Sequence, residues 1–138
     1  MDLGTGTGIL ALAAAVLGAK KILASDLNPL CVKTARKNVR LNHLGETIEV
    51  TQRKAEDLID YSADVVVANI HYPVTRIFLE KRRLLEKDRL IVSGLMWSQY
   101  RELISLLGSL NFEISREWDH EMTWFTAVSY THLRAHET

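Results

Sequence analysis

The chain opens with Asp2-Leu3-Gly4-Thr5-Gly6-Thr7-Gly8, the stretch from which the rest of the fold can be inferred. Three glycines at alternate positions let the backbone turn tightly and let a ligand approach without a clash against a Cβ. The apolar stretch that follows, Ile9–Leu17, predicts a helix that ends at Gly18. The N–H groups at the start of such a helix favour a negatively charged ligand. The stretch therefore predicts a strand, a ligand-binding loop and a helix in succession.

Beyond this loop, short β-branched runs alternate with longer segments of helical periodicity, which is typical of a parallel sheet flanked by helices. Two local signals predict helix starts: Asn28 followed by Pro29 supplies an N-cap and a first helical residue, and Ser98 supplies a second N-cap. Only residues 119–121 separate the last two strands, which predicts an antiparallel hairpin. The sequence thus predicts an α/β fold with a mostly parallel sheet and an antiparallel C-terminal hairpin. Strands are expected at 22–25, 47–51, 63–68, 88–93, 112–118 and 122–128, and helices at 9–17, 29–43, 74–85 and 98–110.

Composition narrows the class of protein. The 138 residues include 17 basic and 17 acidic side chains and are 47% apolar, which is globular and fits one domain. The balanced charge removes the simplest argument for nucleic acid or an anionic membrane as the main partner. Cys31 is the only cysteine, which excludes an internal disulfide and a multi-thiolate zinc site and favours a reducing, cytoplasmic compartment. Because Ile9–Leu17 is much shorter than the ~20 residues that span a bilayer, we expect no membrane partner. We assign no metal site and leave the oligomeric state open.

Both ends of the sequence depart from what a complete domain needs. A glycine loop of this kind follows a strand, and only three residues precede Gly4, so we expect the first strand to be truncated. Residues 131–138 have neither strand nor helix periodicity and resemble translated adapter sequence. We therefore expect one N-terminally truncated domain over residues 1–128 and a non-native or disordered tail over residues 129–138.

The pattern of the glycine loop points to one class of cofactor. A dinucleotide-binding loop reads G-x-G-x-x-G, but Ile9 stands where its third glycine would fall. The pattern D-x-G-x-G-x-G, with Asp2 two residues before the first glycine, resembles motif I of the class I S-adenosylmethionine-dependent methyltransferases. The resemblance implies a Rossmann-like sheet, S-adenosylmethionine as the cofactor, and a role for Asp2 in holding the methionine amino group. It also implies that the loop residues bind the cofactor, namely Gly4, Thr5, Gly6 and Gly8.

Residues after the next two strands are candidates for the nucleoside part of this cofactor. Asp26 ends the second strand, where a carboxylate can accept hydrogen bonds from both ribose hydroxyls. It could instead cap the next helix, but Asn28 is better placed for that. Leu27 offers an apolar wall for adenine. The superfamily resemblance places an acidic residue at the adenine edge, so Glu56 is either a cofactor ligand or an acidic cap of a short helix through Ile59.

The strand at 63–68 ends in Asn69, at the sheet edge where ligands of α/β proteins bind. Amino methyltransferases place Asp or Asn there, and the carbonyl oxygens orient the target nitrogen. The resemblance implies that Asn69 contacts both the acceptor amine and the cofactor, although it could also cap the next helix. We assign Asn69 and Tyr72 as catalytic candidates, with Tyr72 forming either a wall of the acceptor pocket or part of the core. His71 could relay a proton, but we favour an ordinary loop histidine.

Five segments together resemble a narrower family, the PrmA-type methyltransferases. These bacterial enzymes methylate amino groups of large-subunit ribosomal protein L-eleven. The continuation His71-Tyr72-Pro73 departs from the usual family pattern. The segments that carry the resemblance are DLGTGTGILA at 2–11, SDLNPL at 25–30, VVANI at 66–70, LIVSGL at 90–95 and EMTWFTAV at 121–128.

The resemblance implies an S-adenosylmethionine-dependent N-methyltransferase that acts on a protein, in particular a ribosomal protein. Two alternatives stay open. One is methylation of RNA or a small-molecule amine by the same fold; the other is a non-catalytic binding module or an inactive fragment. The basic residues 81–83 and the basic face of the helix at 29–43 could contact RNA phosphate, but the balancing acids favour solvated surfaces. That face comprises Lys33, Arg36, Lys37 and Arg40. We expect Trp97, Trp118 and Trp124 to pack against the sheet and helices.

Overall fold

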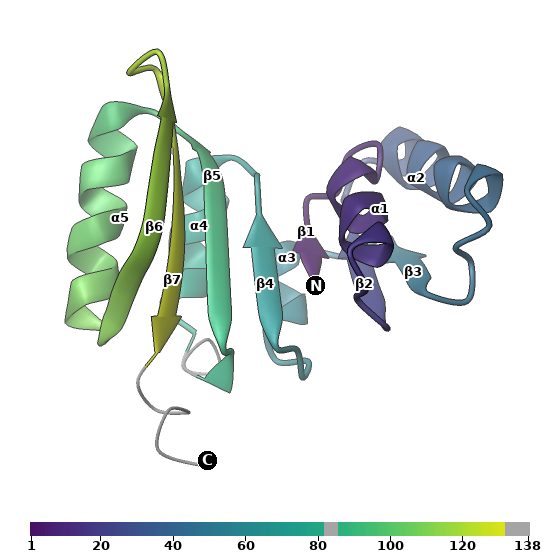
Figure 1. Ribbon diagram of the computed structural model, residues 1–138, viewed down its shortest axis with the longest axis horizontal. Helices are drawn as coiled ribbons and strands as arrows, with labels where there is room; N and C mark the ends of the chain where they lie inside the picture. The colour runs from purple at the N-terminus through teal and green to yellow at the C-terminus, as the bar shows by residue number, and fades with distance from the viewer. Residues whose placement is uncertain (82–85, 132–138) are drawn as a thin grey trace. The chain divides into compact units, whose positions relative to one another are not determined.

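The computed structural model describes residues 1–81 and 86–131 (Figure 1). The chain divides into two compact units, one from Met1 to Leu58 and one from Ile59 onward. Each unit combines parallel strands with helices that follow them along the chain, as the alternating sequence pattern predicts.

The first unit contains three parallel strands in the order β3-β2-β1, and each is followed along the chain by a helix. The core of this unit is formed by apolar residues of α1, β2, α2 and β3, with Ala24 and Ala35 fully buried. Small side chains at these positions let the two longer helices lie close to the strands. The elements are β1 (Asp2–Leu3), α1 (Ile9–Val16), β2 (Ile22–Ser25), α2 (Pro29–Leu41), β3 (Ile48–Thr51) and α3 (Ala55–Leu58).

Helix α2 begins where the local sequence predicts. Asn28 is its N-cap: the side-chain Oδ1 accepts a hydrogen bond from the Leu30 N–H at 2.9 Å, and Pro29 is the first helical residue. Val32, Ala35 and Val39 form the buried face of the helix. The cap and the apolar spacing together fix both the start of the helix and the face that it buries.

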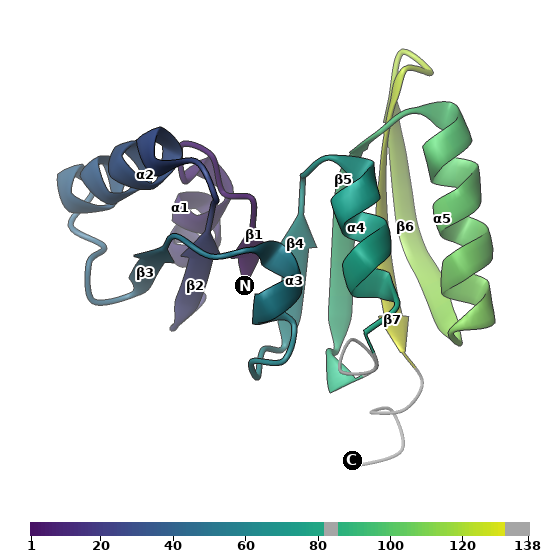
Figure 2. The same cartoon turned by 180° about the vertical axis from the view of Figure 1, so that it is seen from behind.

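The second unit contains strands in the order β4-β5-β7-β6, with β4 and β5 parallel and β7 antiparallel to both β5 and β6. The predicted C-terminal hairpin is therefore present. Helices α4 and α5 lie on the same face of this unit's sheet, as Figure 2 shows. The elements are β4 (Val65–Ala68), α4 (Tyr72–Leu79), β5 (Arg89–Leu95), α5 (Trp97–Ser109), β6 (Phe112–His120) and β7 (Trp124–Thr131).

Most predicted boundaries differ from the structure by one to three residues, and a few differ for identifiable reasons. Ser98 does not cap α5; the N-cap is Met96, whose N–H donates to the Gln99 side-chain Oε1 at 3.0 Å. Strand β7 continues to Thr131, three residues past the predicted domain end, because Ser129 and Thr131 are buried and paired with neighbouring strands. The predicted helix at 74–85 corresponds to α4, which begins two residues earlier, at Tyr72, and ends at Leu79. Residues 82–85 of that prediction, like residues 132–138 of the predicted tail, lie outside the described residues.

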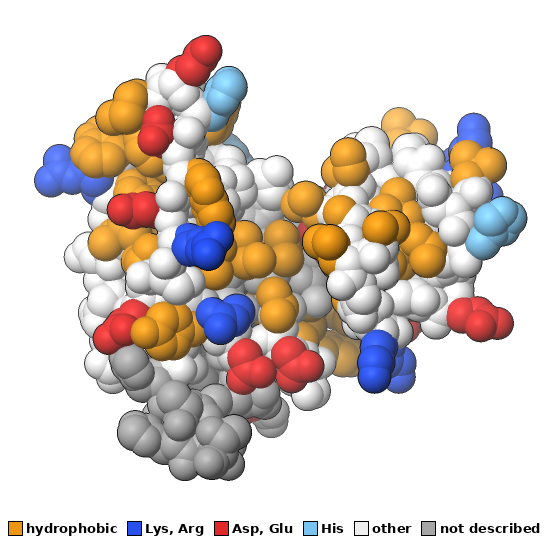
Figure 3. Space-filling model, in the orientation of Figure 1, with side chains coloured by type: hydrophobic (Ala, Val, Ile, Leu, Met, Phe, Trp, Pro, Cys, Tyr) orange, Lys and Arg blue, Asp and Glu red, His pale blue; other side chains and the backbone are white. Residues whose placement is uncertain are grey.

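The described residues bear on two classes of protein, those with membrane-spanning helices and those that hold a metal ion. Over residues 1–81 and 86–131, no helix has both the length and the apolar character needed to cross a membrane. Within the same ranges there is no group of three or more His, Cys, Asp or Glu side chains arranged to hold a metal ion. Apolar side chains do reach the surface of both units (Figure 3).

Candidate functional site

The glycine loop between β1 and α1 adopts a backbone conformation that side chains rarely tolerate. Gly4, Gly6 and Gly8 have φ values of 70°, 59° and 87°. A Cβ placed on Gly6 would meet no atom within 4 Å, whereas one on Gly8 would lie 3.3 Å from the Cβ of Ala35 in α2. Gly6 therefore leaves open space above the loop, and Gly8 allows α1 and α2 to pack closely.

Backbone and side-chain hydrogen bonds hold this loop in place. The Thr5 N–H donates to the carbonyl of Ser25 at 2.8 Å, and the Gly8 N–H donates to the carbonyl of Thr5 at 2.9 Å. From α2, the Asn38 Nδ2 donates to the carbonyl of Thr7 at 2.8 Å. The loop is thus fixed by its own turn, by the end of β2 and by α2.

Asp2 lies in β1 beneath the loop and is buried, with an exposed fraction of 3%. The buried Thr5 hydroxyl donates to its Oδ2 at 2.6 Å. Burial raises the pKa of the Asp2 carboxyl above its usual value, and the hydrogen bond from Thr5 opposes this shift. The structure thus brings together two predicted cofactor residues, Asp2 and Thr5.

Asp26 joins the end of β2 to the loop. Its Oδ2 accepts a hydrogen bond from the Gly6 N–H at 2.9 Å, and its Oδ1 accepts one from the Asn28 N–H at 3.0 Å. The prediction that Asn28 rather than Asp26 caps α2 is confirmed. The predicted ribose-binding carboxylate therefore lies within hydrogen-bond distance of the predicted cofactor loop.

Leu27 and Glu56 lie after β2 and β3 in the same unit. The Leu27 side chain is 57% exposed, and its carbonyl accepts a hydrogen bond from the Gln52 Nε2 at 3.2 Å. Glu56 is half-buried in the first turn of α3, the position that the helix-cap alternative requires. An exposed apolar residue at Leu27 is suited to cover a flat apolar ring.

The second unit contains a pocket of about 690 Å³ at the end of β4. Asn69 is exposed there and forms part of the lining together with Tyr72. Among the described residues that line it, none is Asp, Glu, Lys or Arg. The lining comprises Asn69, Ile70, His71, Tyr72, Ser93, Gly94, Met96, Gln99 and Trp124.

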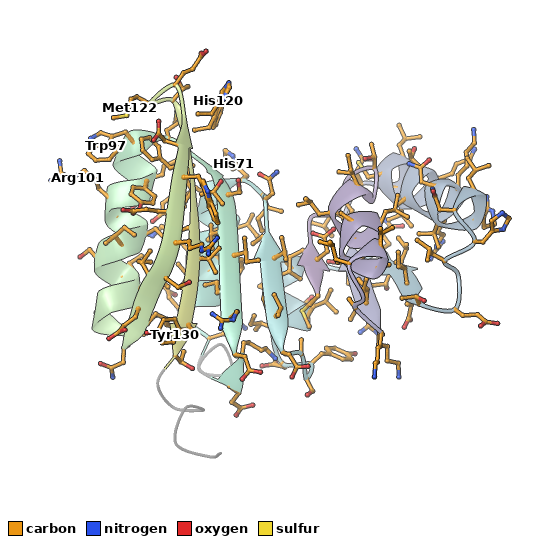
Figure 4. The ribbon with its side chains drawn as sticks, viewed as in Figure 1. His71, Trp97, Arg101, His120, Met122 and Tyr130 are labelled. Atoms are coloured by element: carbon orange, nitrogen blue, oxygen red, sulfur yellow. The ribbon has the colours of Figure 1, made fainter. Side chains whose placement is uncertain are left out.

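Tyr72 and His71 occupy different environments at the start of α4. Tyr72 is buried, and this burial together with the neighbouring Glu102 carboxylate raises the pKa of its hydroxyl to about 12. Glu102 also forms an ion pair with Arg76 at 3.2 Å. With its pKa raised, Tyr72 keeps its proton at neutral pH. His71, in contrast, is the exposed N-cap residue of α4 and lies just beyond the end of β4 (Figure 4).

Sequence reasoning missed several pocket residues that come from β5, α5 and β7. Trp124, for which we expected packing, is 51% exposed and lines the pocket. The alternation of apolar and polar residues along β7 indicates this exposure. Phe125 and Ala127 lie on the buried face of the strand, so Trp124 must point to the other face. Trp97 is 50% exposed, and the other part of its ring packs 5.2 Å from the ring of Phe125 and 6.1 Å from that of Tyr100, so the packing prediction holds for part of this side chain. Trp118 is 52% exposed in β6.

The basic helix face of α2 is exposed at all four predicted positions. The Arg36 Nη2 donates to the carbonyl of Val50 in β3 at 3.0 Å, so this side chain has a role within the fold. In the second predicted cluster, Lys81 is exposed, and residues 82 and 83 lie outside the described residues. Solvated surfaces, the interpretation that we favour for both clusters, and a contact with RNA, the alternative, both stay predictions.

Solved structures share the fold of this chain. A ribosomal protein L11 methylase from Lactobacillus delbrueckii subsp. bulgaricus matches with a TM-score of 0.84 and 29% identity, over 95% of this chain and 68% of that one. A putative RNA methyltransferase from Pyrococcus horikoshii matches with a TM-score of 0.78 and 19% identity, over 94% of this chain and 72% of that one. Both likenesses support the predicted Rossmann-like α/β fold of class I methyltransferases.

Sequence comparison identifies a narrower group. Relatives named ribosomal protein L11 methyltransferase include one from Anoxybacillus flavithermus, 42% identical over 75% of this chain, and one from Bacillus velezensis, 40% identical over 83%. The chain spans about a third of the length of these curated relatives, 34% and 37% respectively. The family model described as ribosomal protein L11 methyltransferase (PrmA) matches residues 1–131. The chain therefore belongs to the ribosomal protein L11 methyltransferase (PrmA) family.

Proposed function

We propose that the protein transfers a methyl group from S-adenosylmethionine to amino groups of a ribosomal protein of the L11 type. The observation that carries this proposal is the hydrogen bond between the Gly6 N–H and the Asp26 carboxylate, which joins an open glycine loop to a ribose-binding acid. Family membership supports the same reaction, because the relatives are named for it. A ribosomal substrate also places the reaction in the cytoplasm.

The residues of the first unit fit this cofactor. The space above Gly6 leaves room for a ligand against the backbone. A carboxylate has about four acceptor positions, and Asp26 uses one on each oxygen for backbone N–H groups, so others are left for ribose hydroxyls. When bound, the cofactor supplies a methyl carbon on a positively charged sulfur. We propose that Asp2, Gly4, Thr5, Gly6 and Gly8 hold its methionine part, that Asp26, Leu27 and Glu56 hold its nucleoside, and that Asn69 contacts it near the methyl group.

The pocket of the second unit suits an amine as the acceptor. The residues described in its lining include no carboxylate that would hold an ammonium ion, and the neutral amine is the form that can attack carbon. The side-chain oxygen of Asn69 accepts a hydrogen bond from the amine and so aims the nitrogen lone pair, while Tyr72 forms a wall. The bound cofactor would supply its methyl carbon to this nitrogen and leave as the neutral thioether, and the nitrogen's surplus proton would pass to water.

Calorimetric titration with S-adenosylhomocysteine tests the cofactor assignment. We expect the protein to bind S-adenosylhomocysteine. Asp26→Ala should bind it at least about tenfold more weakly, because the variant loses the hydrogen bonds of the carboxylate. A tenfold change corresponds to about 1.4 kcal/mol. Asp60→Ala, which removes an exposed acid of the second unit, is the matched control and should leave the affinity unchanged. Equal affinities for the protein and Asp26→Ala would contradict the assignment, as would a folded sample that gives no heat.

Transfer of labelled methyl groups tests the acceptor. We expect label in purified ribosomal protein L11 and none in ribosomal RNA or in free lysine under the same conditions. Label confined to RNA or to the small amine would replace the proposed substrate with one of the alternatives. Binding of S-adenosylhomocysteine without transfer to any acceptor would support the non-catalytic alternative.

A further inference from the structure

The last residues of β5 form an irregularity that faces the pocket of the second unit. The register between β5 and β7 shifts between Val92 and Leu95, and Gly94 within this interval has a φ of 73°. The hydroxyls of Ser93 and Thr126 lie 2.7 Å apart and form a hydrogen bond across the two strands. This bond holds the bulge of β5 in a defined position on β7.

The bulge brings the backbone of Gly94 against the side chain of Asn69. A Cβ built on Gly94 would lie 2.5 Å from the Asn69 Oδ1 and 3.7 Å from its Cγ. No real Cβ comes so close to an oxygen, so the carboxamide occupies space that any other residue at 94 would fill. Both residues line the same pocket. The missing side chain of Gly94 is therefore what allows the carboxamide of Asn69 to lie in this orientation.

We propose that Gly94 is a positioning residue for Asn69. Its bare backbone, held by the Ser93–Thr126 hydrogen bond, forms the surface on which the carboxamide rests and so sets where the Asn69 Oδ1 points. This inference rests on the proposed function, in which that oxygen orients the acceptor amine. Gly94 lines the same pocket, and in this account it affects the transfer through the position of the Asn69 carboxamide.

A methyl on residue 94 should therefore displace the Asn69 carboxamide. Since misplacing a reacting or orienting group by about 1 Å can lower a rate by about 100-fold, we expect Gly94→Ala to lower kcat by about 10- to 100-fold. The affinity for S-adenosylhomocysteine should change no more than it does in Asn69→Ala. In the Asn69→Ala background, adding Gly94→Ala should lower kcat by less than about twofold, because the group it displaces is already absent.

Two further variants separate positioning from general strain. Gly18 has a φ of 107°, and a Cβ built there would meet no atom within 4 Å. Gly18→Ala therefore strains the backbone without creating a new contact, and it should change kcat by less than about twofold. Thr126→Val adds no bulk but removes the hydroxyl that holds Ser93. It should lower kcat, Thr126→Ser should restore it, and neither should matter in the Asn69→Ala background.

An NMR measurement on the same variants is independent of activity. The side-chain amide signal of Asn69, assigned from its loss in Asn69→Ala, should shift in Gly94→Ala and stay in place in Gly18→Ala. The inference is overturned if that signal does not move in Gly94→Ala, or if Gly94→Ala lowers kcat equally with and without Asn69. If the protein transfers no methyl group but the signal shifts as expected, the proposed function fails while the contact between Gly94 and Asn69 stands.

Discussion

At the scale of single residues, Asp26 combines a structural role with a proposed binding role. Its two oxygens accept hydrogen bonds from Gly6 and Asn28, which lie on opposite sides of it along the chain. The same carboxylate is the proposed ligand of the ribose. A residue that positions the loop and also contacts the ligand reduces the reorganisation needed on binding, because the contact surface exists before the ligand arrives.

Asp2 should make stability depend on pH. Its carboxyl is buried and its pKa is raised, so the folded protein holds this proton more tightly than the unfolded chain, where the pKa of Asp is about 3.9. Between that value and the raised native pKa, unfolding releases a proton, and the free energy of unfolding falls as the pH rises. The loss is complete above the native pKa.

Asp2→Asn should remove this pH dependence. The Asn side-chain oxygen can still accept the hydrogen bond of Thr5, but it carries no charge to bury. In urea denaturation at several values between pH 4 and 7, we expect the variant to gain stability relative to the parent protein as the pH rises. A difference that stays constant with pH would contradict this.

The variant should also bind S-adenosylhomocysteine more weakly, because Asp2 is proposed to hold the methionine amino group.

Tyr72 should contribute its ring rather than its hydroxyl. A pKa of about 12 keeps the hydroxyl protonated at the pH of any ordinary assay, so it cannot act as a base. We expect Tyr72→Phe to change kcat by less than about threefold and Tyr72→Ala to destabilise the protein by about 3–5 kcal/mol through the cavity it leaves. Kinetics and urea denaturation measure both effects. A loss of more than about tenfold in kcat for a stable Tyr72→Phe would assign the hydroxyl a chemical role.

At the scale of elements, the sequence predicts those that depend on local signals. Strand β2 has the predicted bounds, Ile22–Ser25, and α2 begins with the predicted cap at Asn28. In both cases neighbouring residues determine the outcome: a short apolar run between polar residues, and an Asn-Pro pair before a helical apolar pattern. The glycine loop belongs to the same class, since three glycines at alternate positions already imply left-handed backbone.

Features that depend on distant residues could not be predicted in this way. The start of α5 is a local exception: Ser98 has the residue type of an N-cap, yet Met96 takes that position because the side chain of Gln99, three residues later, accepts its N–H. The contact of Gly94 with Asn69 joins positions 25 residues apart, and a glycine inside a strand pattern shows only that some close approach exists. The end of β7 at Thr131 likewise depends on pairing with β5 and β6.

The packing of α1 against α2 should be sensitive to one methyl group. Gly8 is the N-cap of α1, with a φ of 87°, and a Cβ there would lie 3.3 Å from the Cβ of Ala35. We expect Gly8→Ala to destabilise the protein by about 1–3 kcal/mol, from left-handed backbone and crowding. Urea denaturation measures this, and the double variant with Ala35→Gly should lose less than the sum of the two single changes. Strict additivity would show that the crowding is absent.

At the scale of the whole molecule, the two compact units divide the proposed chemistry. Residues proposed for the cofactor's methionine part and nucleoside all lie in Met1–Leu58, while the described residues that line the proposed acceptor pocket lie from Ile59 onward. Asn69 is the exception, since it is proposed to contact both ligands. Binding of the cofactor and binding of the acceptor should therefore slow hydrogen exchange in different segments of the chain.

Hydrogen exchange can detect this division directly. At a concentration of S-adenosylhomocysteine 100 times its Kd, amides that exchange only when the ligand has left should slow by about 100-fold, equivalent to about 2.7 kcal/mol. We expect that protection mainly at residues 4–8 and 26–28. Adding the ribosomal protein acceptor should extend it to residues 69–72 and 93–96, where the pocket lining lies. The division would be contradicted by cofactor protection confined to the second unit. It would be contradicted equally by an acceptor that protects the glycine loop and leaves the pocket lining unchanged.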